Sequence, residues 1–515
     1  MKKVLSLALM VAIVLSLVSF ASAEPEYSVT LRIEVYDRGN MPAEYGTPDN
    51  NRWTQWIQEN FGDPNGIKLE YVPIPRGESD VVLNTMMAGG NAPDIVFSYS
   101  ETLYYDYALK GGLYDITDLV DEYGDNLKAN VSMDYGVYQG HRYAIFARRL
   151  EQTITCHFIR KDWLDRIGYE LKVNEDGFYH MSVDDLTECL AKFKELDLDG
   201  TGQEVFPIGA NGSGNVSRST RGIFESFYNR AEIDEKMRVT TPNITWPGFY
   251  EGLEWLNMAY NNRWIDPDFV ADTDNSQKLL DYNIVTGRCG YWTHDAWHGV
   301  QKGEALEQLY LANPEAEVVA FQLDNVYGEQ MVELYAPTGM VIMVPATAKD
   351  EVAEAAVKYL NWLADPKVHL VLYYGIEGEH WEMVDGVPRN IDEQYVAETK
   401  ISTSDLALIY NGDPNYGAKM IVLACPEVIQ PIRATTIELG MVGGFERYSF
   451  GQPIVAETEY GTTLDSKRGE LLATCIMCAP EELKANYDQK VAEYMNIGGQ
   501  AVIDEKTQVY EELNN

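Results

Sequence analysis

The stretch Val29–Tyr36, VTLRIEVY, sets the pattern that the rest of the chain follows. Its residues are mainly apolar or β-branched, and Asp37-Arg38-Gly39 comes directly after it, which predicts a strand that ends in a loop. Large apolar residues then recur at helical spacing in 52–61, after Asn50-Asn51. A second apolar stretch, Ile67–Val72, predicts another strand. A helix between two strands is typical of parallel pairing.

The same alternation continues along the chain. Further strands are predicted at 94–97, 153–160 and 339–344, and helices at 80–89, 161–168, 182–196 and 350–364. Residues from about 395 onward are mainly helical, including an acidic amphipathic tail at 480–513. The pattern therefore predicts an α/β fold of mainly parallel sheets flanked by helices.

The first residues have the layout of a secretory signal peptide. Lys2 and Lys3 precede an apolar run, Val4–Phe20, and the small residues Ala21-Ser22-Ala23 follow it. We expect cleavage before Glu24, with a retained membrane anchor as the alternative. Removing 23 residues from 515 leaves 492, which exceeds the size of one hydrophobic core and predicts at least two domains. The protein is expected to work outside the cytoplasm.

Composition restricts the partners. The chain has 80 acidic and 40 basic residues, a formal net charge of −40, which disfavours nucleic acid and anionic membrane surfaces. Six cysteines do not make a disulfide framework in a chain of this length, so buried free thiols or a single disulfide are expected. A zinc site at Cys475-x-x-Cys478 lacks the second ligand pair that zinc needs.

Four segments carry a family likeness: EVYDRG at 34–39 with NRWTQWIQENF at 51–61, GGNAPDIV at 89–96, IRKDWLDRIG at 159–168, and YGIEGEHWEMVDG at 374–386. In this order the chain resembles extracellular solute-binding proteins of carbohydrate-importing ABC transporters, in the branch of LplA-like and alginate-oligosaccharide-binding proteins. The resemblance implies a two-lobed periplasmic-binding-protein-like fold of type II. It also implies a non-catalytic monomer that closes over an oligosaccharide and delivers it to permease subunits.

By the same resemblance, one lobe would comprise 24–149 and 336–390, and the other 150–335 and 391–515. The chain would cross between them near Ala147–Thr153 and Tyr335–Met340. Family members with a lipid anchor carry a cysteine at the cleavage point, whereas Cys156 is the first cysteine here. We therefore expect a protein that is free in the periplasm or secreted.

Sugar recognition uses aromatic rings that stack on sugar faces and planar polar groups that bind hydroxyls. Gly290–Trp297, which contains YWTHDAW at 291–297, concentrates such groups after a strand-like segment. Its side chains are expected at the ligand, with packing inside a lobe as the alternative. Trp255 shares a helical face with apolar residues and is expected in the core. The candidate ligand-binding residues are Asp37, Arg38, Ser98, Tyr99, Tyr104, Trp246, Trp292, His294, Asp295, Trp297, Glu377, His380 and Trp381.

Several of these candidates also have a structural interpretation. Asp37 and Arg38 end the first strand and could bind hydroxyls or a uronic carboxylate, or form a structural ion pair. Ser98, Tyr99 and Tyr104 follow the strand at 94–97. They could likewise contact the ligand or have a structural role. In the GIEGEHW segment, a turn would depend on the glycines more than on the side chains.

One segment suggests a metal. Residues 197–204, DLDGTGQE, space oxygen-bearing side chains around two glycines, as a calcium loop would, although the loop is shorter than an EF-hand. It resembles the calcium loop of alginate-binding relatives, so a structural Ca²⁺ is expected, with a solvated Asx-type turn as the alternative. The expected ligands are Asp197, Asp199, Thr201, Gln203 and Glu204.

The main alternative function is a secreted glycoside hydrolase, which also needs aromatic rings and a pair of carboxyl groups. Nucleophile-elbow, zincin, P-loop and dinucleotide motifs are absent from the sequence. A calcium-dependent adhesion protein is a third possibility, but the α/β alternation disfavours the β-sandwich modules usual there.

Overall fold

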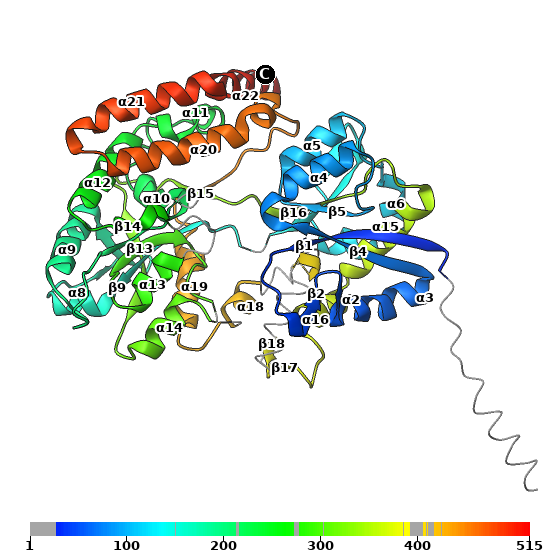
Figure 1. The fold of residues 1–515 in the computed structure, drawn as a ribbon, viewed down its shortest axis with the longest axis horizontal. Helices are drawn as coiled ribbons and strands as arrows, with labels where there is room; N and C mark the ends of the chain where they lie inside the picture. The colour runs from blue at the N-terminus through cyan, green and yellow to red at the C-terminus, as the bar shows by residue number, and fades with distance from the viewer. Residues whose placement is uncertain are drawn as a thin grey trace, which may run out of the picture.

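The computed structural model describes residues 27–149, 151–212, 216–271, 278–301, 303–384, 386–391, 405–407, 409, 417–423 and 425–514. Figure 1 shows two α/β lobes joined by extended segments. The expected signal peptide, 1–23, lies outside the described residues. We call the lobe that contains the N-terminal strand lobe 1 and the other lobe 2.

Lobe 1 is built on a sheet whose strands run in the order β4 (Ile67–Pro75), β1 (Val29–Asp37), β5 (Val96–Ser98), β16 (Thr338–Met343) and β8 (Ala144–Arg148). β1 and β4 pair in parallel from Val29↔Ile67 to Asp37↔Pro75, and the parallel bridge Ile33↔Ile95 joins β1 to β5. Only β16 is antiparallel to its neighbours in this sheet, as far as the described residues extend. Leu31 and Ile33 of β1 point into the core, as the alternating pattern requires.

Helices cover both faces of this sheet. Asn51 caps α2 by accepting hydrogen bonds from Trp53 N and Thr54 N, which explains why the helix begins where the sequence predicts. α15 packs its alanine and leucine face against β1 and contributes Ala353, Val357 and Leu360 to the core. The helices are α2 (Arg52–Ile57), α3 (Asp63–Asn65), α4 (Ser79–Ala88), α5 (Glu101–Leu109), α6 (Thr117–Tyr123), α7 (Asp125–Asn130), α15 (Asp350–Leu363) and α16 (Pro366–Tyr374).

The described part of lobe 1 also contains three short hairpins. They are β2 (Gly46–Thr47) with β3 (Asn50–Asn51), β6 (Val137–Tyr138) with β7 (His141–Arg142), and β17 (Trp381–Val384) with β18 (Val387–Asn390). Leu406, Ala407 and Ile409 pack into the lobe 1 core, although the sequence assigns 391–515 to lobe 2. We therefore propose that lobe 1 extends to about residue 409.

Lobe 2 has a sheet in the order β10 (Lys172–Val173), β11 (Tyr179–Ser182), β14 (Val318–Asp324), β9 (Thr155–Arg160), β13 (Tyr291–Asp295) and β12 (Ile208–Gly209). β11 with β14 and β12 with β13 are parallel pairs. β9 runs antiparallel to both of its neighbours, β13 and β14. Both sheets are therefore mixed. Each contains parallel pairs and one interior antiparallel strand, and in lobe 2 the edge strand β10 is also antiparallel to its neighbour β11.

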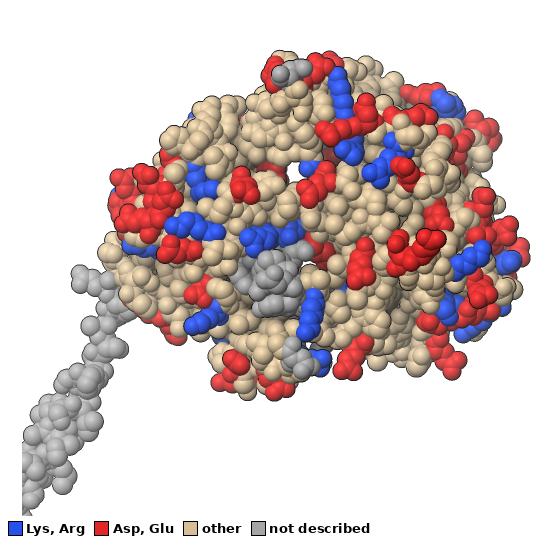
Figure 2. Space-filling model, turned by 180° about the vertical axis from the view of Figure 1, so that it is seen from behind, with Lys and Arg blue, Asp and Glu red and all other residues tan. Residues whose placement is uncertain are grey.

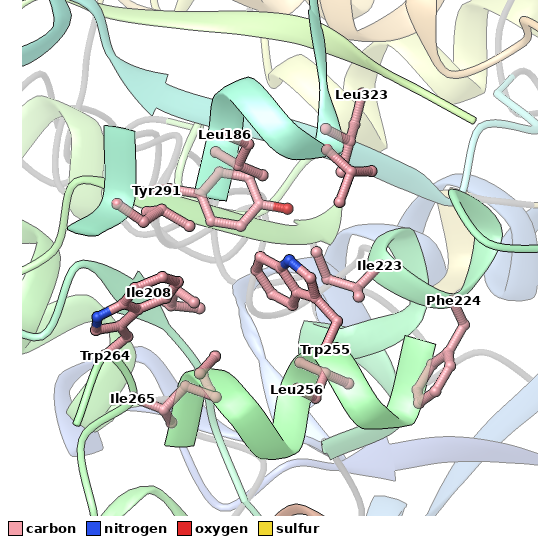
Figure 3. Close-up of a cluster of buried hydrophobic side chains, with 14 of the residues drawn as sticks. Leu186, Ile208, Ile223, Phe224, Trp255, Leu256, Trp264, Ile265, Tyr291 and Leu323 are labelled. Atoms are coloured by element: carbon pink, nitrogen blue, oxygen red, sulfur yellow. The ribbon is translucent and has the colours of Figure 1, made fainter. Parts of the chain in front are cut away.

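The lobe 2 core lies between this sheet and the surrounding helices. Figure 3 shows Trp255 and Trp264 among aliphatic side chains in this core, and the Trp255 indole donates to Thr187 Oγ1. Trp255 thus occupies the core position predicted from its helical face. The early helices are α8 (Lys161–Arg166), α9 (Val183–Glu195), α10 (Val216–Glu225), α11 (Glu235–Thr240), α12 (Phe249–Asn261), α13 (Lys278–Val285) and α14 (Ala305–Ala312).

The described C-terminal part of the chain is mainly helical, as predicted. Helix α18 contacts β18 of lobe 1 as well as α19, and the later helices belong to lobe 2. Helices α20, α21 and α22 lie over one end of lobe 2, next to α11 and α12 (Figure 1). A short parallel pair, β15 (Val332–Leu334) with β19 (Gly444–Glu446), lies beside the connection to lobe 1. The helices are α18 (Gly417–Leu423), α19 (Gln430–Leu439), α20 (Val455–Met477), α21 (Leu483–Tyr494) and α22 (Gln500–Asn514).

The two interior antiparallel strands, β9 and β16, share one topological property. β9 is the first strand after the chain passes from lobe 1 to lobe 2, and β16 is the first after it returns. The two crossing segments are hydrogen-bonded side by side: Arg149 N donates to Pro337 O at 2.8 Å, and Tyr335 N donates to Gln152 O at 2.9 Å. The two segments therefore run side by side, and we propose that they are the two crossings between the lobes.

Candidate functional site

The crossing segments present an aromatic pair. The Trp297 ring stacks on the Tyr335 ring, with centroids 5.7 Å apart and planes inclined by 23°. Trp297 follows β13 by two residues, and Tyr335 belongs to the second crossing. Both side chains are half-buried, so each keeps surface for a ligand. The Arg149 guanidinium lies 4.4 Å from the Tyr335 ring centroid and donates from Nε to Thr338 O.

Charged groups of lobe 2 surround this pair. Asp295 ends β13, is buried, and has Arg218 3.5 Å away. Burial raises the pKa of the Asp295 carboxyl, while Arg218 and Arg221 oppose the shift. Burial also raises the pKa of the Tyr335 phenol; the Asp295 charge adds to this, and the nearby arginines 221, 218 and 149 counteract it.

Lobe 1 contributes a second aromatic pair at the ends of β1 and β5. Tyr36 and Tyr99 stack with centroids 6.1 Å apart, and the Arg76 guanidinium lies 4.8 Å from each centroid. The Tyr99 hydroxyl donates to Asp405 Oδ1 at 3.2 Å. Arg38 Nη2 binds both oxygens of Asp405, so this candidate forms a structural ion pair, the second of the two roles that the sequence left open.

The two pairs are close in space. The Arg149 guanidinium and the Tyr99 phenol interact electrostatically, and Thr338 Oγ1 donates to Glu101 Oε1 at 3.4 Å across the beginning of β16. Rings and guanidinium groups thus alternate from lobe 1, through the crossing, to lobe 2. We name this set the aromatic–arginine cluster: Tyr36, Arg76, Tyr99, Arg149, Trp297 and Tyr335. Such a set can stack on sugar rings and donate planar pairs of hydrogen bonds.

The structure corrects several candidates in the YWTHDAW segment. The sequence places this segment after a strand, but Tyr291–Asp295 is itself strand β13, paired on both sides. Trp292 is 0% exposed and stacks on Phe158 at 5.3 Å, so it packs the core. His294 is also buried, and its Nδ1 accepts from Asp295 N. Burial, together with the nearby His298 and arginines, holds the His294 pKa well below its usual value.

Two further candidates are core residues. Tyr104 is 0% exposed because its face of α5 packs against Phe146. Trp246 is 9% exposed, contacts Tyr228 edge to face, and donates from Nε1 to Thr241. An aromatic side chain on a helix or loop is buried when the surface next to it is apolar. The position of a single aromatic residue in the sequence does not show whether this is the case.

The remaining candidates stabilise turns. Ser98 is buried and accepts from Ser100 N, while Asp37 accepts from Gly39 N. In the GIEGEHW segment, His380 Nδ1 accepts from Ile376 N, and the buried Trp381 donates to Gly375 O. These bonds fold the segment on itself, with Gly378 at a φ of 83°, so the turn interpretation holds.

Four members of the cluster were not among the ligand-binding residues predicted from the sequence: Tyr36, Arg76, Arg149 and Tyr335. Arg149 and Tyr335 lie inside the two crossings that the family likeness predicted. An aromatic residue in one crossing and an arginine in the other could therefore have been predicted as ligand-binding residues from the sequence. Arg76 follows β4 directly, and no local pattern separates it from an ordinary surface arginine.

The predicted calcium loop does not assemble a metal site. Asp199 binds the buried Arg160 through both oxygens at 2.8 Å and accepts from Trp163 Nε1. Glu204 pairs with Lys194 and Arg263, which lower its pKa to about 2. Among the described residues no group of three or more His, Cys, Asp or Glu side chains could hold a metal ion.

The loop instead folds as the Asx-type alternative predicts. Asp197 accepts from Thr201 N and Gly202 N, and Gly200 and Gly202 adopt φ values of 66° and 67°. Its three carboxylates are therefore committed to hydrogen bonds or cations of this chain, and the residues do not fit a bound Ca²⁺. Within the turn, Gln203 N donates to Thr201 Oγ1.

Surface charge and thiols are distributed without a second obvious site. On the face in Figure 2, Asp and Glu are spread over both lobes, and Lys and Arg are dispersed among them without forming one continuous patch. All six cysteines are free thiols, and Cys478 alone is not fully buried. Within the described ranges, no helix has both the length and the apolar character to cross a membrane.

Two α/β lobes joined by paired crossings, with aromatic and guanidinium groups where they meet, define a two-lobed binding protein. The family described as bacterial extracellular solute-binding protein matches residues 47–369, and the chain belongs to this family. The fold and the family membership expected from the sequence are therefore confirmed.

Individual relatives are distant. The lipoprotein LipO of Bacillus subtilis is 22% identical over 337 residues, which cover 64% of each chain, so the match spans less than two thirds of LipO. The polygalacturonan/rhamnogalacturonan-binding protein YtcQ of the same organism is 21% identical over 86% of each chain.

Solved structures show the same fold. The alginate-binding protein AlgQ2, determined without calcium ion, has a TM-score of 0.66 at 15% identity, covering 94% of this chain and 98% of that chain. The ABC-transporter substrate-binding protein FusA of S. pneumoniae, in complex with kestose, has a TM-score of 0.65 at 16% identity, covering 94% and 99%.

Proposed function

We propose that this protein captures an oligosaccharide between its two lobes and delivers it to the permease subunits of an ABC importer. The observation that carries the proposal is the stacked Trp297–Tyr335 pair at the crossings, continued by Arg149 and the tyrosines of lobe 1. A ligand held there touches both lobes and the connection between them. Its binding energy can therefore favour a closed arrangement.

The relatives support a carbohydrate ligand. YtcQ is described as binding polygalacturonan and rhamnogalacturonan, AlgQ2 as binding alginate, and FusA was solved with kestose. These sugars differ in charge and linkage, so the likeness supports the ligand class and leaves the particular sugar to the residues of this chain.

Binding without catalysis is the second part of the proposal. Glycoside hydrolysis needs one carboxyl group as acid and another as base or nucleophile, on opposite sides of the bond. In the cluster, Asp295 is held beside Arg218 and Asp405 is bound by Arg38 and Tyr99. Carboxylates fixed in ion pairs are poorly placed for proton transfer to a sugar.

A thermal-shift screen tests both parts. Mono- and oligosaccharides are added to purified protein, and a bound ligand should raise the melting temperature increasingly as its concentration exceeds Kd. The same mixtures are assayed for reducing ends after several hours. Release of reducing ends would establish the hydrolase instead, and a flat screen over neutral and acidic sugars would remove the carbohydrate assignment.

We further propose that the protein acts as a monomer outside the cytoplasmic membrane. The family membership supports an extracellular location, and the Ala21-Ser22-Ala23 site supports removal of the leader. Mass spectrometry of the protein from its native host tests this: a mature N-terminus at Glu24 without added lipid is expected. An acylated N-terminus would place it with anchored relatives such as LipO.

Calcium is not needed for the 197–204 loop, we propose, because cations of the chain itself neutralise its carboxylates. Arg160 forms an ion pair with Asp199, while Lys194 and Arg263 form ion pairs with Glu204. One solved FusA structure is that of an EF-hand mutant, so the structural neighbours include a protein with such a motif. In this chain, ion pairs take the place that the sequence assigns to a metal ion.

A further inference from the structure

Among the residues that the structure describes, no carboxylate forms an ion pair with either arginine of the aromatic–arginine cluster. Arg149 is half-buried, and its Nε donates to Thr338 O, but its Nη groups make no hydrogen bond or ion pair with any described residue. Arg76 is also half-buried, and its polar contact is a long one, Nη1 to Ser79 Oγ at 3.4 Å. Both guanidinium groups lie over tyrosine rings, which leaves their N–H edges free for a planar partner.

The described carboxylates nearby are already engaged. Glu151, whose charge acts on Arg149, is bound by Arg433. Asp405 is bound by Arg38, Glu333 by Arg447, and Asp295 lies beside Arg218. Glu101 accepts from Thr338, and burial raises its pKa. Glu34 is fully buried, and burial raises its pKa to about 8, so at neutral pH it carries little charge to offset Arg76.

These two arginines have no carboxylate partner among the described residues, although the chain has 80 acidic residues against 40 basic ones. Closing two lobes around a neutral sugar would remove water from both guanidinium groups and give them no counter-charge, which is unfavourable. A ligand with carboxylates supplies that charge, and guanidinium groups bind carboxylates through two parallel N–H···O bonds.

We propose that the ligand is an anionic oligosaccharide containing uronic acid residues, with Arg149 and Arg76 as the groups that bind its carboxylates. Trp297, Tyr335 and Tyr99 stack on the sugar rings between them. This inference rests on the proposed function and narrows it to an acidic substrate class. It also separates two roles: the rings select for a sugar, and the arginines select for charge.

The experiment compares charged and neutral versions of the same sugars by calorimetry. The probes are uronate trimers (α-1,4-trigalacturonate and a mannuronate trimer), their carboxyl-reduced neutral counterparts, and neutral fructo- and gluco-oligosaccharides of similar length. We expect at least one uronate trimer to bind and its reduced counterpart to bind roughly 100-fold more weakly, because two charge-assisted hydrogen-bonded contacts are lost. Uronate affinity should also fall as salt concentration rises.

Variants test the assigned residues. Arg149→Gln and Arg76→Gln should each weaken uronate binding roughly tenfold or more, while the melting temperature of the free protein stays close to wild type. Arg149→Lys should recover part of the affinity, because it restores charge without the planar fork. The matched control is Arg230→Gln, at an exposed arginine that pairs with Glu329 on lobe 2, away from the cluster, and it should bind like wild type.

The outcomes are distinct. A neutral trimer that binds as tightly as its uronate form overturns the inference and leaves the proposed function standing, as do Arg149→Gln and Arg76→Gln proteins with unchanged uronate affinity. If no sugar of either kind binds, the proposed function fails, and this inference fails with it.

Discussion

Trp292 and Trp297, five residues apart, have opposite environments, and substitution should separate their roles. Trp292→Ala removes a fully buried ring stacked on Phe158 and should destabilise the protein by about 3–5 kcal/mol. Trp297→Ala removes a half-buried ring next to Tyr335 and should leave stability nearly unchanged. It should weaken ligand binding by about 2 kcal/mol, roughly 30-fold, as expected for an aromatic anchor.

Urea denaturation and ligand titration of both variants make the comparison. Trp292→Ala serves as the control for a structural tryptophan, since residual folded protein should bind ligand with nearly normal affinity. If Trp297→Ala kept wild-type affinity, the stacked pair would have no part in the site.

Glu34 should make stability depend on pH. Burial raises its folded-state pKa to about 8 from the ordinary 4.5, so between these values the folded protein holds a proton that the unfolded chain has released. Stability therefore falls as pH rises toward 8. Between pH 7 and 8 the loss amounts to about 1 kcal/mol, and above pH 8 it levels off.

Glu34→Gln removes this pH dependence of stability. It preserves an acceptor for the Phe97 N–H, which in the wild type bonds to Glu34 Oε2. Unfolding free energies of the two proteins at pH 7 and pH 8 give the measurement. The buried His157 and His369, whose pKa values burial lowers to about 3 and 4, affect stability mainly at lower pH. Equal pH slopes for wild type and Glu34→Gln would show that Glu34 is ionised in the folded state.

The sequence predicted which residue types the site contains. It predicted only in part which of these side chains point into the core and which face the ligand. The sequence points to the YWTHDAW segment, but strand pairing of β13 with β9 and β12 turns its first five residues inward and leaves Trp297 beyond the strand end. Burial of a side chain in a sheet depends on neighbours far along the chain, here 155–159 and 208–209. No pattern within the segment contains that information.

At the scale of elements, local signals were reliable. Asn51 and Ser182 cap α2 and α9 where the sequence predicted helix starts, and Ser182 Oγ accepts from Asp185 N. The 197–204 loop failed as a metal site for a non-local reason. Its cationic partners Arg160, Lys194 and Arg263 come from three other segments, and the loop sequence alone does not predict these ion pairs.

This loop gives a prediction on metal removal. Because its carboxylates are satisfied by the chain's own cations, a chelator should leave the melting temperature of the protein unchanged. Asp199→Asn should destabilise by about 3–5 kcal/mol with or without Ca²⁺, since it leaves the buried Arg160 with an incomplete set of partners.

Differential scanning fluorimetry with EDTA and with added Ca²⁺ is sufficient. Asp197→Asn is the matched control: its carboxylate caps the exposed turn, so a smaller loss is expected. A melting temperature that drops in EDTA and recovers with Ca²⁺ would show that a metal binds after all.

For the whole molecule, the proposed site predicts a change of shape. A ligand bridging the aromatic pairs of both lobes should draw them together, so the radius of gyration in small-angle scattering should decrease on saturation. Trp297→Ala at the same ligand concentration should remain as extended as the free protein. No compaction of the wild type under saturating ligand would mean that the lobes do not close.

The paired crossings also decide the order in which the molecule can be completed. The sheet of lobe 2 uses strands from one continuous stretch, 155–324, whereas lobe 1 needs β16, residues 338–343, between strands β5 and β8 made much earlier. Until that segment arrives, β5 and β8 each present an open edge and cannot close their sheet. A chain leaving the ribosome or passing through a membrane pore thus keeps its N-terminal lobe unfinished until two thirds of its length is through, which favours passage as an unfolded chain and assembly on the far side.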